Sequence, residues 1–433
     1  MASIRFLGAA QEVTGSCHLV SSAAVGKVLL DCGMHQGGDA VDRLRDERFG
    51  FKPAEIDAVI LSHAHIDHSG LLPKLVSEGF RGPIYCTRAT ADLLQVMLND
   101  AAGLYERDLE RENLRRSRRG APELQPAYTR ADVERVFKQC SPQRYRQPFA
   151  IGEAGSVTFH DAGHILGSAI VELTLQEQGR EKRLVFSGDL GKKDSVLLFD
   201  PDVLTRADVV MMEGTYGDRD HRTLGNTLEQ FEQVLSEAWE RGGNVMIPAF
   251  AVGRTQELLF YLGQLHQQGK LDNWEIFLDS PMAIEVTRLY DRWLSQLDCE
   301  GAKGLCSGDQ TLLRDFLPRL RLTASTDESM MINKIKRGAL IIAGSGMCTG
   351  GRIRHHFKQR IWDERNTLIF VGYQARNTLG RILIDGVKRI KLFREEYLVR
   401  AQIETLGGFS AHAGQTGLVD WVSHFETSPK VVL

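Results

Sequence analysis

Leu61-Ser-His-Ala-His-Ile-Asp-His68 places three imidazoles and a carboxylate within six positions, directly after a short apolar run. Residues two apart on an extended chain point to the same side, so His63 and His65 can bind one ion while Asp67 and His68 turn toward a second. Nitrogen and carboxylate ligands without thiolate favour zinc, with manganese or iron as alternatives. Burying these polar groups beside a strand without a partner would be costly, so metal binding explains them better than a structural role.

Length and composition indicate an ordinary globular protein of two or three domains: 433 residues, 42% hydrophobic and 25% charged. The formal net charge of -3 means that nucleic-acid binding would need a local basic patch. The start of the chain lacks the features of a signal peptide, and no stretch reaches the ~20 apolar residues of a membrane span. We therefore expect a cytoplasmic protein without membrane contact.

The cysteines support a reducing compartment, because their spacing shows no disulfide-like rhythm and no Cys-x-x-Cys pair. They are Cys17, Cys32, Cys86, Cys140, Cys299, Cys306 and Cys348.

Short apolar runs alternate with amphipathic stretches along the whole chain, which is typical of an α/β fold. Several runs end in a residue that can act in catalysis or metal binding. In α/β proteins the functional site commonly lies at the strand ends. These residues are Asp31, His63, Asp189, Glu213, Asp279 and Ser345. The pattern changes after Glu213, so we expect a first domain over residues 1–213, an inserted α/β domain over 214–402, and a return to the first domain over 403–433.

A highly charged segment covers residues 106–119. Its mixed signs at helical spacing favour a solvated helix over an RNA-contacting arm. Such an arm would consist of Arg115, Arg116, Arg118 and Arg119.

Two later loops contain further candidate ligands. His164 lies in Asp161-Ala-Gly-His-Ile-Leu-Gly-Ser168 and Asp189 in Phe186-Ser-Gly-Asp-Leu-Gly191. Glycine neighbours by themselves are equally typical of polar turn residues. Together with the histidine loop and Asp31, in this order, they resemble the metallo-β-lactamase superfamily and its His-x-His-x-Asp-His loop.

That resemblance implies an αββα sandwich with two zinc ions. His63, His65 and His164 would bind one ion, Asp67 and His68 the other, and Asp189 would bridge them. Asp31 would orient the histidine loop without touching metal.

Further motifs resemble the β-CASP branch of the superfamily, in which an α/β domain is inserted. They are Met212-Glu-Gly-Thr-Tyr-Gly-Asp-Arg219, Pro248-Ala-Phe-Ala-Val-Gly-Arg254, Leu278-Asp-Ser-Pro-Met282, Ala343-Gly-Ser-Gly-Met347, Gly350-Gly-Arg352 and Gly407-Gly-Phe-Ser-Ala-His412. Members cleave nucleic acids, and the architecture is similar to bacterial and archaeal homologues of the pre-mRNA 3′-end cleavage subunit. This implies a zinc-dependent ribonuclease acting on single-stranded RNA, as an endonuclease and secondarily as an exonuclease, and a homodimer.

The same resemblance suggests catalytic roles. His412 would protonate the leaving oxygen, Glu213 would orient His412 and keep it charged, and Asp67 would act through the metal site. Phosphates would meet backbone N–H groups of Ser345 and Gly346 in a cleft between the domains. Arg254 and Arg352 would add positive charge there, with an exposed helix surface as the alternative for the run that begins at Arg352.

One feature departs from the β-CASP pattern, in which a further histidine after the last core strand completes the second metal site. This sequence ends at Lys430-Val-Val-Leu433, so we expect either a truncated chain or a weak second zinc site. Two other functions remain as alternatives: a thioester or lactone hydrolase, and a non-catalytic scaffold subunit. The scaffold is disfavoured by the presence of six candidate ligands, His63, His65, Asp67, His68, His164 and Asp189.

Overall fold

The computed structural model describes residues 2–35, 40–177, 179–293, 313 and 316–433, so Cys299 and Cys306 lie outside the described residues. The chain divides into two compact units. Unit 1 comprises Met1–Lys193, Asp200–Asp218 and His412–Leu433, and unit 2 comprises Asp194–Phe199 and Arg219–Ala411. Unit 2 extends beyond residue 402 because the strand Gln402–Thr405 pairs within its sheet.

Unit 1 contains two six-stranded sheets. The first has the order β1 (Ser3–Phe6), β2 (His18–Ser22), β3 (Gly26–Leu30), β4 (Ala58–Ile60), β5 (Ile84–Thr87), β6 (Cys140–Gln143). The second has the order β20 (Val431–Val432), β11 (Val209–Met211), β10 (Arg180–Phe186), β9 (Ala169–Glu177), β8 (Gly155–Asp161), β7 (Phe149–Ile151). From β3 to β6 the first sheet is parallel, so the strands β3, β4 and β5 end at one edge.

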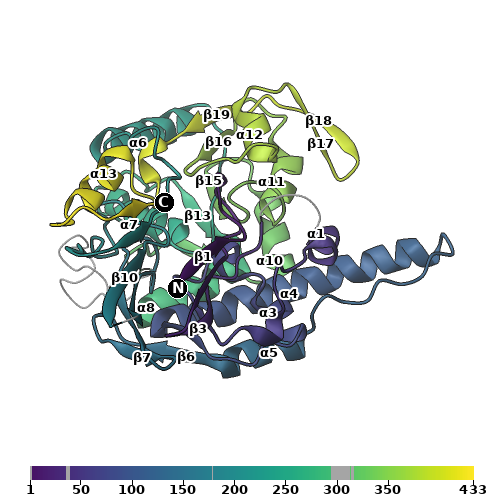
Figure 1. The fold of residues 1–433 in the computed structure, drawn as a ribbon. Coiled ribbons are helices and arrows are strands. Elements are labelled where there is room, and N and C mark those ends of the chain that lie inside the picture. The colour runs from purple at the N-terminus through teal and green to yellow at the C-terminus, as the bar shows by residue number, and fades with distance from the viewer. Residues whose placement is uncertain (1, 36–39, 178, 294–312, 314–315) are drawn as a thin grey trace. The chain divides into compact units, whose positions relative to one another are not determined.

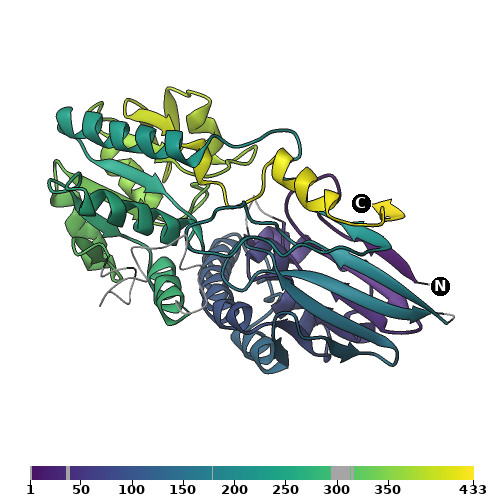
Figure 2. The ribbon, with the colours of Figure 1, turned by 90° about the vertical axis from the view of Figure 1, so that its left-hand side faces the viewer.

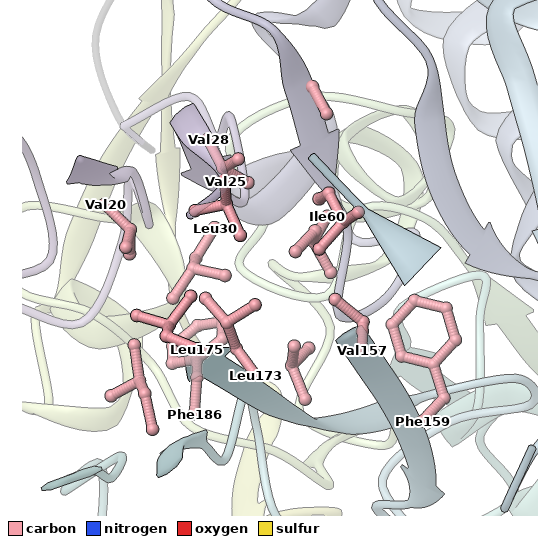
Figure 3. Close-up of a cluster of buried hydrophobic side chains, with 14 of the residues drawn as sticks. Val20, Val25, Val28, Leu30, Ile60, Val157, Phe159, Leu173, Leu175 and Phe186 are labelled. Carbon is pink, nitrogen blue, oxygen red and sulfur yellow. The ribbon is translucent and has the colours of Figure 1, made fainter. Parts of the chain in front are cut away.

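The two sheets of unit 1 bury one core between them (Figure 2; Figure 3). Val28 and Ile60 from the first sheet meet Phe159, Leu173 and Phe186 from the second. These side chains alternate along each strand with residues of the opposite face, several of which are also buried, among them Leu29, Val59 and Val185.

Helices cover the outer faces of unit 1 (Figure 1). The helices of unit 1 within the described residues are α1 (Ala40–Asp46), η1 (Pro53–Glu55), α2 (Ile66–Ser69), α3 (Leu72–Ser77), α4 (Arg88–Ser117), α5 (Arg130–Gln139) and α13 (Gln415–Ser423). Contacts of α4 with β5 and β6 place it on the first sheet, and Trp421 of α13 packs with Val185 and Val210 of the second. The expected αββα sandwich is confirmed, and the charged segment forms the exposed end of α4.

Unit 2 is built on a parallel sheet of six strands. Their order is β14 (Leu320–Leu322), β13 (Glu275–Leu278), β15 (Ala339–Ala343), β12 (Val245–Pro248), β16 (Thr367–Phe370), β19 (Gln402–Thr405). Its helices are α6 (Leu224–Glu240), α7 (Arg254–Gln267), α8 (Pro281–Arg292), α10 (Thr326–Met331), η3 (Ile332–Lys334), α11 (Ile353–Arg360), α12 (Leu379–Ile384) and η4 (Gly407–Phe409). The hairpin of β17 (Arg389–Leu392) and β18 (Glu395–Leu398) packs into the same apolar core as α11 and α12.

No helix within the described ranges is both long enough and apolar enough to cross a membrane.

Candidate active site

The histidine loop lies at the end of β4 in unit 1. His63 and His65 follow the strand, and the chain then turns into α2, which contains Asp67 and His68. A second loop supports this turn, because Cys32 N–H donates to the carbonyl of His68 (2.8 Å). A Cβ atom on the adjacent Gly33 would lie 1.6 Å from the carbonyl oxygen of Asp67, so only glycine fits there.

Three imidazoles and one carboxylate converge on a common point. Nδ1 of His65 lies 3.1 Å from Nε2 of His63 and 3.2 Å from Nε2 of His164. Asp189 Oδ2 lies 3.5 Å from His63 Nε2 and 3.4 Å from His164 Nε2. These four donor atoms lie within 4.8 Å of one another, close enough together to hold one metal ion.

The other oxygen of Asp189 faces a second group. Its Oδ1 lies 3.4 Å from Nε2 of His68. Asp67 directly precedes His68 in α2. The two oxygens of Asp189 therefore face different candidate ligands, Oδ2 toward His63 and His164 and Oδ1 toward His68.

Asp31 is hydrogen-bonded to the histidine loop through His68 and Ser62. Its Oδ2 accepts hydrogen bonds from Nδ1 of His68 (2.7 Å) and from the hydroxyls of Ser62 (2.9 Å) and Ser16 (3.0 Å). Its Oδ1 accepts from the backbone N–H of Ser62 (2.8 Å). Because Nδ1 of His68 is engaged, its Nε2 is left to face Asp189.

Protonation states of His63, His164 and Asp189 suit metal binding, whereas His68 must lose a proton to act as a ligand. Burial opposes the charge of His68, but Asp189 and Asp31 raise the pKa of that ring. Burial lowers the pKa of His63 and of His164, so both imidazoles are neutral and can donate a lone pair. Burial opposes the charge of Asp189, but the neighbouring His68 and His412 lower the pKa of that carboxyl group. Neutral imidazoles with an ionised carboxylate are the donor set that a divalent cation needs.

A histidine–glutamate pair lies beside these ligands. His412 enters unit 1 next to the Asp189 loop, where Ala413 N–H donates to the carbonyl of Leu190 (2.8 Å). Nδ1 of His412 lies 3.2 Å from both carboxylate oxygens of Glu213, and its ring centroid lies 4.5 Å from that of His164. Burial alone would lower the pKa of His412, but Glu213 and Asp189 raise it to about 9, so the imidazole is charged at neutral pH.

The candidate substrate-binding residues lie in unit 2, and their contacts there differ. Ser345 and Gly346 follow β15, and the hydroxyl of Ser345 accepts from Gly350 N–H (3.2 Å). Arg352 donates to Asp279 Oδ1 (2.7 Å) and to the carbonyls of Thr323 and Ala324. Arg254 is buried and paired with Glu257. The two guanidinium groups are thus occupied inside unit 2.

Two serines of the site were not singled out from the sequence. The hydroxyl of Ser62 lies 3.0 Å from Nδ1 of His63 as well as contacting Asp31. Its position directly before His63 was a usable signal. Ser16 carried no such signal, because its contact with Asp31 depends on the pairing of β2 with β3.

Comparison with known protein families accounts for most of the chain. The metallo-beta-lactamase superfamily model matches residues 11–237. The Beta-Casp domain model matches residues 255–383, and the model of a Zn-dependent metallo-hydrolase RNA specificity domain matches residues 396–433.

Individual relatives cover nearly the whole sequence. A protein named as a ribonuclease in Thermus thermophilus is 41% identical over 98% of this chain and 91% of its own length. An RNase J-like protein of Methanocaldococcus jannaschii is 30% identical over 100% of this chain and 92% of its own length. A transcription termination factor, FttA, of the same archaeon is 32% identical over 99% of this chain, which spans 66% of that relative.

Proposed function

This chain belongs to the metallo-β-lactamase superfamily and to its β-CASP branch, and from that premise we propose that it is a zinc-dependent ribonuclease hydrolysing the phosphodiester bonds of single-stranded RNA. Endonucleolytic cleavage is the main activity proposed, with exonucleolytic trimming as a second one. The names of the relatives in Thermus thermophilus and Methanocaldococcus jannaschii support RNA as the substrate.

One observation carries the proposal: within unit 1, the metal-ligating cluster and the charged His412–Glu213 pair share Asp189 as a neighbour. A phosphodiester hydrolase needs both electrophilic assistance at phosphorus and a proton for the leaving oxygen. A metal-binding scaffold alone would have no use for a protonated histidine beside the ligands.

The ligand roles follow from the donor atoms. His63, His65 and His164 would hold one zinc ion, Asp67 and His68 the other, and Asp189 would contribute one oxygen to each. Bound there, the ions would supply a nucleophile by acidifying water and would neutralise charge on the phosphate. Asp31 keeps His68 oriented, because it accepts the Nδ1 proton of that ring.

His412 acts as the general acid in this scheme. Its Nδ1–H donates to Glu213, so Nε2–H remains to protonate the departing oxygen. Glu213 is held in place by backbone N–H of Leu190 (2.6 Å), and it contributes orientation and charge without touching the substrate.

Substrate binding would involve the glycine-rich loop after β15 of unit 2. Backbone N–H groups of the loop that contains Ser345 and Gly346 would meet phosphate oxygens. Arg254 is paired with Glu257 and Arg352 with Asp279, which instead supports a structural role for both arginines.

We also propose a homodimer, which sedimentation velocity would test. A cytoplasmic location is proposed as well, and the free thiols of the described cysteines support it: Cys17, Cys32, Cys86, Cys140 and Cys348.

Cleavage assays on zinc-loaded protein test the function. Wild type, Asp67→Ala and His412→Ala are incubated with labelled single-stranded RNA, single-stranded DNA and a thioester. RNA cleavage lost in both variants and retained in His424→Ala, an exposed histidine of unit 1, is the expected result. Turnover of the thioester without cleavage of RNA would reject the ribonuclease.

A further inference from the structure

The turn between β17 and β18 has an unusual composition for its geometry. Leu392 pairs with Glu395, so the loop consists of Phe393 and Arg394 alone. Both have positive φ, 50° and 73°. Two-residue hairpin loops of this kind normally carry Asn-Gly or Asp-Gly, because a bulky side chain is strained at positive φ. A hairpin that only had to reverse the chain would not need phenylalanine here, so the strain points to another role.

The Phe393 ring is part of an exposed aromatic group. It is 43% exposed, and the ring of His355 from α11 stacks on it with centroids 4.6 Å apart and an interplanar angle of 28°. The guanidinium of Arg354 lies 5.4 Å from the same ring centroid. Two flat rings and a cation therefore lie together on one surface of unit 2, between α11 and the hairpin.

The charges around this group favour an anionic partner. Lys358 is paired with Glu395 (3.5 Å) and Arg389 with Glu396 (3.8 Å). Arg394 is exposed and takes part in no ion pair within the described part of the chain. Burial, followed by the charges of Arg354 and Lys358, lowers the pKa of His355, so its ring is neutral at neutral pH. Positive charge here comes mainly from Arg354 and Arg394.

We propose that Phe393, His355, Arg354 and Arg394 form a base-stacking platform for single-stranded RNA. Nucleic-acid bases stack on aromatic rings, histidine and guanidinium planes without sequence preference, while neighbouring arginines contact phosphates. The platform rests on the proposed ribonuclease function, since it would bind that enzyme's substrate. It lies outside the ligand cluster and contributes nothing to bond cleavage.

Packing is the competing explanation, in which Phe393 only attaches the hairpin to α11. The double variant Phe393→Asn/Arg394→Gly separates the two explanations, because Asn-Gly is the preferred sequence for this turn and should keep the hairpin folded without strain. His355→Leu is a second variant, which keeps apolar packing and removes the flat ring. Trp362→Ala is the matched control, an exposed aromatic of unit 2 outside the platform.

Binding is measured by fluorescence anisotropy with a labelled oligouridine and with an abasic ribose-phosphate chain of equal length, in EDTA to prevent cleavage. Wild type and Trp362→Ala should bind the oligouridine roughly fivefold to tenfold more tightly than the abasic chain. In the double variant and in His355→Leu this preference should disappear, with the melting temperature of the double variant unchanged or raised. A preference that persists in both variants, or that wild type lacks, would overturn the platform. Cleavage of RNA by zinc-loaded wild type is assayed separately, so failure of the proposed function is distinguishable from failure of the platform.

Discussion

Nδ1 of His412 lies 3.2 Å from each carboxylate oxygen of Glu213, although 199 residues separate them in the sequence. Glu213 follows β11, and His412 is the first residue of the segment that returns to unit 1. The pair therefore exists only when the chain has passed through the whole of unit 2 and come back. The proposed mechanism needs this pair, because Glu213 keeps His412 charged. The proton donor is therefore in place only in the folded protein.

The first prediction tests the proton donor. His412→Ala should lower kcat on RNA by roughly 10²–10⁴-fold, because the ribose oxygen is a poor leaving group without protonation. Hydrolysis of bis(p-nitrophenyl) phosphate should fall much less, since nitrophenolate leaves unprotonated. Equal losses on the two substrates would show that His412 acts on metal or substrate binding instead. His424→Ala serves as the control histidine.

The bridging position of Asp189 leads to a second prediction. Asp189→Ala should lower the metal-to-protein ratio after dialysis below that of His63→Ala, because Asp189 faces candidate ligands with both oxygens, Oδ2 toward His63 and Oδ1 toward His68. Elemental analysis by mass spectrometry measures this ratio. Asp327→Ala removes an exposed carboxylate of unit 2 and should leave the ratio unchanged. A ratio in Asp189→Ala equal to that of wild type would contradict the bridging role.

A third prediction concerns Ser62. Its hydroxyl donates to Asp31, so the hydroxyl oxygen can accept the Nδ1 proton of His63 and direct Nε2 of that ring toward the metal. Ser62→Ala should weaken zinc affinity by roughly 10–100-fold in a competition titration with a chelating dye. Ser22→Ala is the control, because that hydroxyl accepts from the backbone N–H groups of Ala24 and Val25, away from the candidate ligands. Unchanged affinity would leave Ser62 without a role in orienting the ligand.

The buried Asp279 of unit 2 provides a prediction about pH. Burial opposes its charge, but hydrogen bonds from His356, Ser329 and Thr323 lower its pKa from 3.8 to about 2. A lowered pKa in the folded state stabilises the protein above pH 4, and this contribution is lost as pH falls from about 4 toward 2. Asp279→Asn should therefore cost about 2–4 kcal/mol at neutral pH.

Denaturant unfolding at several pH values measures this contribution. The difference between wild type and Asp279→Asn should shrink as the pH approaches 2, because the wild-type carboxyl group then becomes neutral as well. Asp327→Asn provides the exposed control. A difference that stays constant with pH would mean that the carboxylate charge of Asp279 does not stabilise unit 2.

Several features were predictable because they are local. His63, His65, Asp67 and His68 lie within one turn of chain, so strand and loop geometry brings them together with little help from the rest of the molecule. His164 and Asp189 were predicted as candidate ligands from two further features, namely their order after this loop and their glycine neighbours. The αββα sandwich followed from the same resemblance, and the packed core between the two sheets of unit 1 confirms it.

Arg352 shows what sequence reasoning could not resolve. Its place in a glycine-rich motif left a phosphate contact and an exposed helix surface as alternatives, and the structure pairs it with Asp279, 73 residues away. The Phe393–Arg394 turn is similar, since the sequence there contains neither glycine nor asparagine to indicate a two-residue loop. In both cases the role of the residue depends on which residues lie next to it in the folded chain. The pairing of the strands determines those neighbours.

Residue order alone was enough to predict the fold class and to single out candidate metal ligands, because metal sites depend on side-chain type and short spacing. The three-dimensional arrangement decided the rest: which oxygen of Asp189 faces which histidine, which serines hold Asp31, and which arginines remain exposed. Those facts arise from contacts between segments far apart in the chain, and burial then sets the protonation of each group. The spacing of residues along the chain predicts neither these long-range contacts nor the protonation states.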